Sequence, residues 1–145
     1  MDGLIMHILK KDKIEITEFD AKRLKTLIIT AGNSSSDIEI WLDKLQLFLE
    51  KAKIVSSEHI KPDCVTMNSR IELLDSENHE KMIVTLVFPA TAFMEYEPGF
   101  EKFDVSILSP IGLSVLGRKA GDYIFSRISI TKILYQPEAA GDFHL

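Results

Sequence analysis

Apolar residues recur at helical spacing in two consecutive segments of the chain, and a capping pattern precedes each of them. Thr17 with Asp20 forms the first capping box, and the apolar residues that follow are Leu24, Leu27, Ile28 and Ala31. Ser36 with Glu39 forms the second, and the apolar residues that follow are Ile38, Trp41, Leu42, Leu45, Phe48, Leu49 and Ala52. Because only about four residues separate the predicted helices, they are expected to fold back as an antiparallel hairpin, a short coiled coil.

Three large apolar residues, Ile29, Ile40 and Leu47, fall outside the stripes that face each other in this hairpin. A second surface is therefore expected to cover them, and it belongs either to the rest of the chain or to a partner, including a second copy. At ~1.5 Å per residue the two helices would be about 20 and 27 Å long.

After Pro62 the pattern changes to apolar runs of strand length. Residues 65–74 and 82–88 are predicted to form a β-hairpin around a polar turn at 75–79, with a third strand at 103–108. Residues 123–135 have enough Ile and Phe for two more strands, with a turn near Ser126 or Ser129. Proline 110 and the glycines at 112, 117 and 121 bracket one short helix at 111–116. The sequence thus predicts an α+β protein, with a helical hairpin in residues 1–62 and a mostly antiparallel sheet domain in residues 63–145.

The chain has 17 basic and 22 acidic residues, a net charge of −5, and the imbalance lies in its second part. Residues 1–62 hold ten of each, whereas residues 63–145 hold seven basic and twelve acidic residues. Proteins that bind nucleic acid through its phosphates concentrate Lys and Arg on one face. Direct binding of nucleic acid is therefore not expected.

No apolar run approaches the roughly 18 residues that cross a bilayer, and residues 1–13 lack the features of a secretory signal. We therefore expect a cytoplasmic protein that does not bind a membrane. Cys64 is the single cysteine, which excludes an internal disulfide and a zinc site built from thiolates. Its position at the start of an apolar run predicts a small buried side chain rather than a catalytic thiol.

Catalytic and metal-binding patterns are missing from the sequence. The four histidines are scattered, at positions 7, 59, 79 and 144, and the chain has neither a phosphate-binding loop, a dinucleotide fingerprint nor a nucleophile elbow. Asp37 and Glu39, at the predicted tip of the hairpin, could hold a magnesium ion, but capping of the second helix explains both carboxylates more simply. The residues alone predict a binding protein, not an enzyme, with no cofactor and no metal.

Three motifs resemble those of a known family. They are Val-Thr-Met-Asn-Ser-Arg at 65–70, Ile-Leu-Ser-Pro-Ile-Gly at 107–112 with Leu-Gly at 116–117 and Gly-Asp at 121–122, and Tyr-Gln-Pro-Glu-Ala-Ala-Gly-Asp-Phe at 135–143. The middle motif is shared across the Gre superfamily, and the other two are more specific to the Rnk family, the regulators of nucleoside diphosphate kinase. From about residue 14 onward the chain resembles this family, which is related to the transcript cleavage factors GreA and GreB.

The resemblance to the Rnk family implies an FKBP-like fold for the sheet domain and RNA polymerase as the partner. Gre-type proteins dock this domain on the rim of the bacterial polymerase secondary channel and insert the coiled coil, whose tip carboxylates help position magnesium for cleavage of backtracked RNA. The Rnk coiled coil is too short to reach the active site, which implies competition with Gre factors without cleavage. The docking loop of the family maps onto Ser109, Pro110, Ile111 and Gly112, although Pro110 and Gly112 could equally serve only to turn the chain.

Two other functions stay open beside this one. An FKBP-like prolyl isomerase would need an aromatic pocket, for which the available residues are Phe93, Tyr96, Phe100 and Phe103. The family name also suggests direct binding to nucleoside diphosphate kinase, or an indirect effect on the level of that kinase. The chain departs from the family in residues 91–102, which are longer, at Leu108, where Gre factors tend to carry a polar residue, and in residues 121–136, which lack the usual Pro-Gly-Gly turn.

Overall fold

The computed structural model describes residues 14–31, 36–89 and 102–145, and of Ser36, Asp37 and Lys102 it describes the backbone only. The chain divides into two compact units, Met1–Ile60 and Lys61–Leu145, which we describe in turn. The described residues form a mixed α+β protein with three helices. None of these helices is long and apolar enough to cross a membrane.

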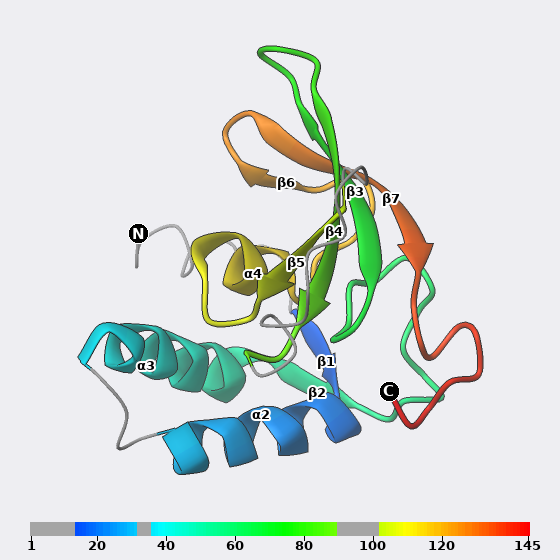
Figure 1. Ribbon diagram of the computed structural model, residues 1–145. Helices are drawn as coiled ribbons and strands as arrows, with labels where there is room; N and C mark the ends of the chain where they lie inside the picture. Colours follow the sequence, from blue (N-terminus) through cyan, green and yellow to red (C-terminus); the bar gives the residue numbers. More distant parts are fainter. Residues whose placement is uncertain (1–13, 32–35, 90–101) are drawn as a thin grey trace. The chain divides into compact units, whose positions relative to one another are not determined.

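The first unit contains the predicted helical hairpin, formed by α2 (Glu18–Ala31) and α3 (Ser36–Lys51) (Figure 1). Thr17 caps α2 as predicted, because its hydroxyl oxygen accepts a hydrogen bond from the Asp20 backbone N–H at 3.0 Å. The predicted capping of α3 by Ser36 lies outside the described side chains. Both helices end within two residues of the bounds that the apolar pattern indicated.

Burial within the hairpin follows the predicted apolar stripes. Leu24 of α2 and Leu45 of α3 are fully buried, as expected of residues on the seam between two helices. The three residues predicted to lie off this seam are exposed: 79% of Ile29, 58% of Ile40 and 36% of Leu47 is accessible to solvent. The hairpin therefore presents apolar side chains on its outer surface.

A short parallel strand pair at the base of the hairpin was not predicted. It joins β1 (Glu15–Thr17), just before α2, to β2 (Lys53–Val55), just after α3. The Lys53 N–H donates to the Ile14 carbonyl oxygen at 2.8 Å, and both Ile14 and Ile16 are buried. Strands of three residues are too short to show an alternating pattern, so tertiary pairing alone identifies them.

The second unit is a five-stranded sheet with one short helix. Its elements are β3 (Arg70–Asp75), β4 (Lys81–Val87), β5 (Lys102–Ser106), α4 (Pro110–Val115), β6 (Tyr123–Phe125) and β7 (Ile128–Tyr135). The strands lie in the order β5-β4-β3-β7-β6. The β3–β4 hairpin, the short helix and the final pair of strands are confirmed. The FKBP-like character of the sheet stays a prediction.

The sheet is mostly antiparallel, as predicted, and the pairing of β5 is the exception. The pairs β3–β4, β3–β7 and β6–β7 are antiparallel, but β5 runs parallel to β4, with Val84 beside Phe103 and Leu86 beside Val105. Parallel neighbours need a long crossover connection, and residues 88–101 are long enough to supply one. An apolar run by itself does not reveal its direction, so the pattern could not distinguish the two arrangements.

The first strand of the sheet is shorter than predicted, because residues 65–69 form a turn, which is buried except at the half-buried Asn68. Asn68 has a φ of 67°, in the left-handed region, and the Ser69 N–H donates to the Thr66 carbonyl oxygen at 3.0 Å, which closes a turn. Val65 and Met67 are fully buried and alternate with polar residues, as they would in a strand with one buried face. Cys64 is 2% exposed, which confirms that it is a buried side chain.

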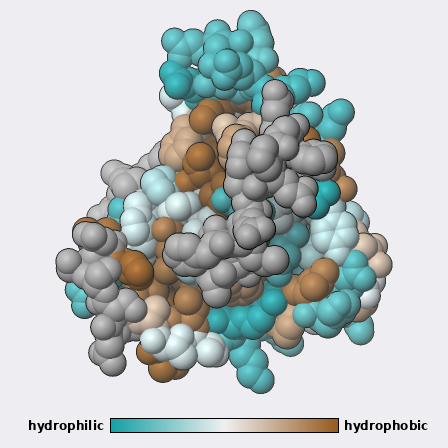
Figure 2. Space-filling model, viewed as in Figure 1, coloured by the Kyte–Doolittle hydropathy of each residue, from teal (hydrophilic) through white to brown (hydrophobic). Residues whose placement is uncertain are grey.

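The turn between β3 and β4 is polar and exposed, and it forms the hydrophilic top of the view in Figure 2. Arg127, in the turn between β6 and β7, holds this tip by ion pairs with Asp75 at 3.4 Å and with Glu77. The two turns are therefore tied together at one end of the sheet. Surface ion pairs of this kind contribute up to about 1 kcal/mol each.

Candidate docking site

The predicted docking loop, Ser109 to Gly112, forms the tight passage from β5 into α4. Ser109 is the N-cap of the helix: its hydroxyl oxygen accepts from the Gly112 N–H at 3.1 Å and its hydroxyl group donates to the Ser106 carbonyl oxygen at 2.6 Å. Pro110 occupies the first turn of α4, where its lack of an N–H costs nothing. These bonds fix the loop rigidly against the end of β5.

Gly112 packs so closely against the end of β5 that there is no room for a side chain. It is buried, and a Cβ at this position would lie 1.9 Å from the Ser106 carbonyl oxygen and 2.7 Å from the Ser106 carbonyl carbon. Both atoms belong to the backbone, so no rotamer change could relieve the contact. The glycine therefore lets α4 approach the end of β5 closely, which is more than turning the chain.

The exposed part of the docking loop is the corner formed by Pro110 and Ile111. Pro110 is exposed and Ile111 is half-buried, as is the preceding Leu108. Ser109 donates its only hydroxyl hydrogen to the Ser106 carbonyl oxygen, so its hydroxyl group can act toward a partner only as an acceptor. Of the four residues predicted from the resemblance, Pro110 and Ile111 are thus the ones that can present apolar surface.

The hairpin tip carries the second predicted set of site residues. Glu39 is exposed near the start of α3, and the side chain of Asp37 lies outside the described residues. Within the part of the chain that the structure describes, no group of three His, Cys, Asp or Glu side chains is placed to hold a metal ion. The role of the two tip carboxylates stays a prediction.

The aromatic pocket needed by a prolyl isomerase falls mostly on residues that the structure does not describe. Phe93, Tyr96 and Phe100 lie outside the described residues. Phe103, on strand β5 at the edge of the sheet, is 46% exposed. The one described member of the set is therefore a surface side chain.

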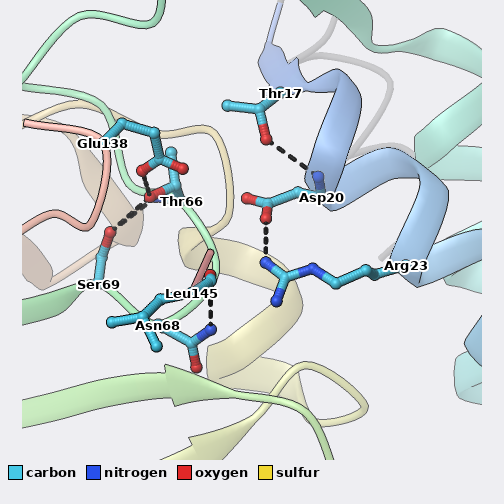
Figure 3. Close-up of polar contacts among 8 residues, drawn as sticks. All are labelled: Thr17, Asp20, Arg23, Thr66, Asn68, Ser69, Glu138 and Leu145. Carbon is cyan, nitrogen blue, oxygen red and sulfur yellow. Dashed lines mark hydrogen bonds and ion pairs between the residues drawn. The ribbon is translucent and has the colours of Figure 1, made fainter. Parts of the chain in front are cut away.

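A second polar cluster joins two motifs that lie far apart in the sequence. The Thr66 hydroxyl group donates to a Glu138 carboxylate oxygen at 2.7 Å, and Thr66 and Ser69 share a hydroxyl–hydroxyl bond of 2.9 Å (Figure 3). The Ser69 hydroxyl oxygen also accepts from the Thr66 N–H at 2.9 Å. Thr66 and Ser69 are almost fully buried, so their polar atoms depend on these partners. Sequence reasoning noted both motifs and missed that they meet.

Residues 135–145, which we call the tail, make further bonds to the same part of the chain. The Gln136 side-chain amide donates to the carbonyl oxygens of Lys61 and Cys64, each at 2.7 Å. The Asn68 side-chain amide donates to the Leu145 carbonyl oxygen at 3.1 Å. Gln136 is only 4% exposed, although it is polar, because both of its amide hydrogens are used. The tail is thus fastened along its length.

Tyr135 begins the tail and forms a hydrogen bond with Asp142. The phenol donates to the Asp142 carboxylate, and this bond raises the pKa of Tyr135 above its ordinary value of 10.0. A phenol with a raised pKa stabilises the fold fully below pH ~10 and loses this contribution as the pH rises through its folded-state pKa. We expect Asp142→Ala to lower the pKa of Tyr135 toward 10.0, measured by titration of tyrosinate absorbance.

The assignment of that titration to Tyr135 needs a control, since the chain has three tyrosines. Tyr135→Phe should remove the part of the titration that responds to Asp142→Ala, whereas Tyr123→Phe, at an exposed residue of β6, should leave that part in place. An unchanged titration in Asp142→Ala would show that the phenol–carboxylate bond does not set this pKa.

Comparison with known proteins places this geometry in a class. Residues 60–130 match the family described as transcription elongation factor, GreA/GreB, C-term. The solved structure of a prokaryotic transcription elongation factor GreA/GreB from Nitrosomonas europaea is 32% identical, with a TM-score of 0.64, and the match covers 86% of this chain and 99% of that one. The fold is therefore that of a GreA/GreB-like protein.

The particular family within this class follows from a full-length relative. The regulator of nucleoside diphosphate kinase of Escherichia coli (strain K12) is 30% identical over 145 residues, which cover 94% of this chain and all of the relative. The chain belongs to the family of the regulators of nucleoside diphosphate kinase, as its three motifs indicated. The transcription elongation factor GreA of Thermoanaerobacter pseudethanolicus is 33% identical over 94 residues, and this chain spans only 56% of its length. These relatives are named as regulators and elongation factors, and the names and the fold together support a regulatory role of the transcription-factor type.

Proposed function

We propose that the protein is a non-catalytic regulator that binds RNA polymerase at the secondary channel and competes there with Gre-type factors. The observation that carries the proposal is the docking loop: a capped, glycine-dependent turn that presents Pro110 and Ile111 on a rigid base. Rigid apolar corners bind with little loss of conformational entropy. A polymerase partner would also place the protein in the cytoplasm.

Competition without transcript cleavage is the second part of the proposal. The helices of the hairpin have 14 and 16 residues, hence lengths of about 21 and 24 Å at ~1.5 Å per residue. An arm of this length leaves the tip, with Asp37 and Glu39, short of a catalytic centre at the end of a long channel. The protein would then occupy the entrance and exclude a Gre factor without supplying carboxylates to the active site.

The proposal is tested with purified core polymerase. We expect the protein to bind, to be displaced by a Gre factor, and to leave backtracked transcripts uncleaved. Ile111→Glu should weaken binding by about tenfold or more, because it places a charge in the centre of an apolar contact. The matched control is Leu134→Glu, which makes the same change at a 46% exposed residue of β7.

Three results would contradict the proposal. They are absence of binding, binding that a Gre factor does not displace, and transcript cleavage that depends on Asp37 and Glu39. Equal weakening by Ile111→Glu and Leu134→Glu would show that the docking loop is not the contact.

The name of the Escherichia coli relative, regulator of nucleoside diphosphate kinase, suggests an effect on that kinase. We propose that this effect is indirect and acts on kinase levels, through the proposed contact of the Pro110–Ile111 corner with polymerase. Co-purification of the protein with the kinase in the absence of polymerase would instead support direct binding.

A further inference from the structure

Residues 63–69, which we call the support segment, are bonded to the chain just after α4. The Val65 N–H donates to the Arg118 carbonyl oxygen at 2.8 Å, and the Gly117 N–H donates to the Val65 carbonyl oxygen at 2.9 Å. Cys64 forms a β-bridge with Lys119. The chain at the C-terminal end of α4 is therefore held by the support segment.

The same support segment is bonded to β4, the strand that lies beside β5, which leads into the docking loop. The Asn68 N–H donates to the Leu86 carbonyl oxygen at 2.6 Å, and the Leu86 N–H donates to the Ser69 carbonyl oxygen at 3.0 Å. The next residue, Val87, accepts from the Ile107 N–H at 2.9 Å, two residues before the docking loop. Both ends of the passage from β5 through α4 are thus fastened, directly or through β4, to one seven-residue segment.

The support segment is in turn fixed by a directed chain of hydrogen bonds that ends on the tail. The Thr66 hydroxyl hydrogen goes to the Glu138 carboxylate, which can only accept. The Ser69 hydroxyl hydrogen must then go to the Thr66 hydroxyl oxygen, while the Ser69 oxygen accepts from the Thr66 N–H. Every donor in this series of hydrogen bonds is used. The last acceptor is the Glu138 carboxylate, whose negative charge strengthens the bond from Thr66.

We propose that Thr66, Ser69 and Glu138 are positioning residues for the docking loop: they lock the support segment, which sets where the Pro110–Ile111 corner lies. This inference rests on the proposed function, because positioning matters only if the loop docks. Thr66 is 1% exposed and Ser69 is fully buried, so a hydroxyl that loses its acceptor cannot turn to water. The support segment must shift instead, and the hydrogen bonds that hold both ends of the passage from β5 through α4 shift with it.

The decisive variants are Thr66→Val, which removes the hydroxyl at nearly constant volume, and Thr66→Ser, which restores it. We expect Thr66→Val to weaken polymerase binding by about tenfold and Thr66→Ser to recover most of the loss. Amide hydrogen exchange supplies a readout that does not depend on polymerase. Exchange at Ile107 and Gly117, whose N–H groups mark the two ends of the docking passage, should be faster in Thr66→Val, whereas Ile130 should be unaffected.

A matched control shows whether loss of any such bond has this effect. Thr131 of β7 donates its hydroxyl group to a Glu72 carboxylate oxygen of β3 at 2.6 Å, the same chemistry between two strands that are not part of the passage from β5 into α4. Thr131→Val should leave polymerase binding and the exchange at Ile107 and Gly117 unchanged. Glu138→Ala removes the acceptor at a half-buried residue. It therefore tests the same series of hydrogen bonds if Thr66→Val fails to fold.

The two proposals fail in different ways. If the wild-type protein does not bind polymerase, the proposed function is wrong, and the exchange data alone still decide whether the support segment holds the docking loop. If binding occurs but Thr66→Val and Glu138→Ala leave both binding and exchange unchanged, the positioning role is overturned. Equal effects of Thr131→Val and Thr66→Val would overturn it as well, because they would show general destabilisation.

Discussion

Gly112→Ala is expected to destabilise the second unit by about 2 kcal/mol, although alanine is the better helix former. In the interior of an exposed helix the change from glycine to alanine is favourable by up to about 1 kcal/mol. Here the new Cβ would meet the Ser106 carbonyl oxygen at 1.9 Å, and forced overpacking of this kind costs about 1–3 kcal/mol or more. The steric term outweighs the propensity term, because backbone atoms of β5 and α4 must separate.

Urea unfolding of the full chain measures the effect, with Ser114→Ala as the matched control in the same helix. Ser114 is half-buried and donates a solvent-exposed hydrogen bond to the Pro110 carbonyl oxygen at 2.6 Å, so loss of its hydroxyl group should change the free energy of unfolding by less than about 0.5 kcal/mol. Under the proposed function, Gly112→Ala should also weaken polymerase binding, since the docking loop moves with α4. A variant as stable as the wild type would show that α4 can retreat from β5 at no cost.

Gly112 also illustrates what the sequence could not show about the docking site. The motif containing Ser109 and Pro110 marked a loop and a helix start, because capping and proline preferences are local properties. The contact between Gly112 and Ser106 depends on how a helix packs against a strand end, which no local pattern encodes. The same holds for Thr66 and Glu138, which are separated by 72 residues and meet only in the folded chain.

The elements of the fold likewise differ in whether a local sequence pattern encodes them. The two helices of the hairpin were predictable, because a 3.6-residue repeat sustained over 14 and 16 residues is a strong signal. The β1–β2 pair was not, because three residues carry no pattern, and the direction of β5 was not, because pairing partners decide it. Residues 65–69 form a turn where a strand was predicted, since the buried Val65 and Met67 alternate with polar residues in this turn as they would in a strand.

The second large effect concerns the helical hairpin. We expect Leu45→Ala to destabilise the first unit by about 3 kcal/mol, because truncation of a fully buried leucine removes apolar burial and leaves a cavity, at a typical cost of 2–5 kcal/mol. Loss of helical circular dichroism on heating would report the change. Leu24→Ala on the facing helix should have a similar effect, and the double variant should show coupling if the two side chains share one cavity.

Leu47→Ala is the matched control, because it makes the same truncation on the same helix two residues away. Leu47 is 36% exposed, so this variant should cost less than about 1 kcal/mol. The pair separates the two explanations of the outer apolar residues of the hairpin. If Leu47→Ala leaves stability unchanged but weakens polymerase binding, the outer face contacts the partner. If it destabilises the protein as much as Leu45→Ala, Leu47 is covered by the chain itself, and the exposed face that we describe does not exist in solution.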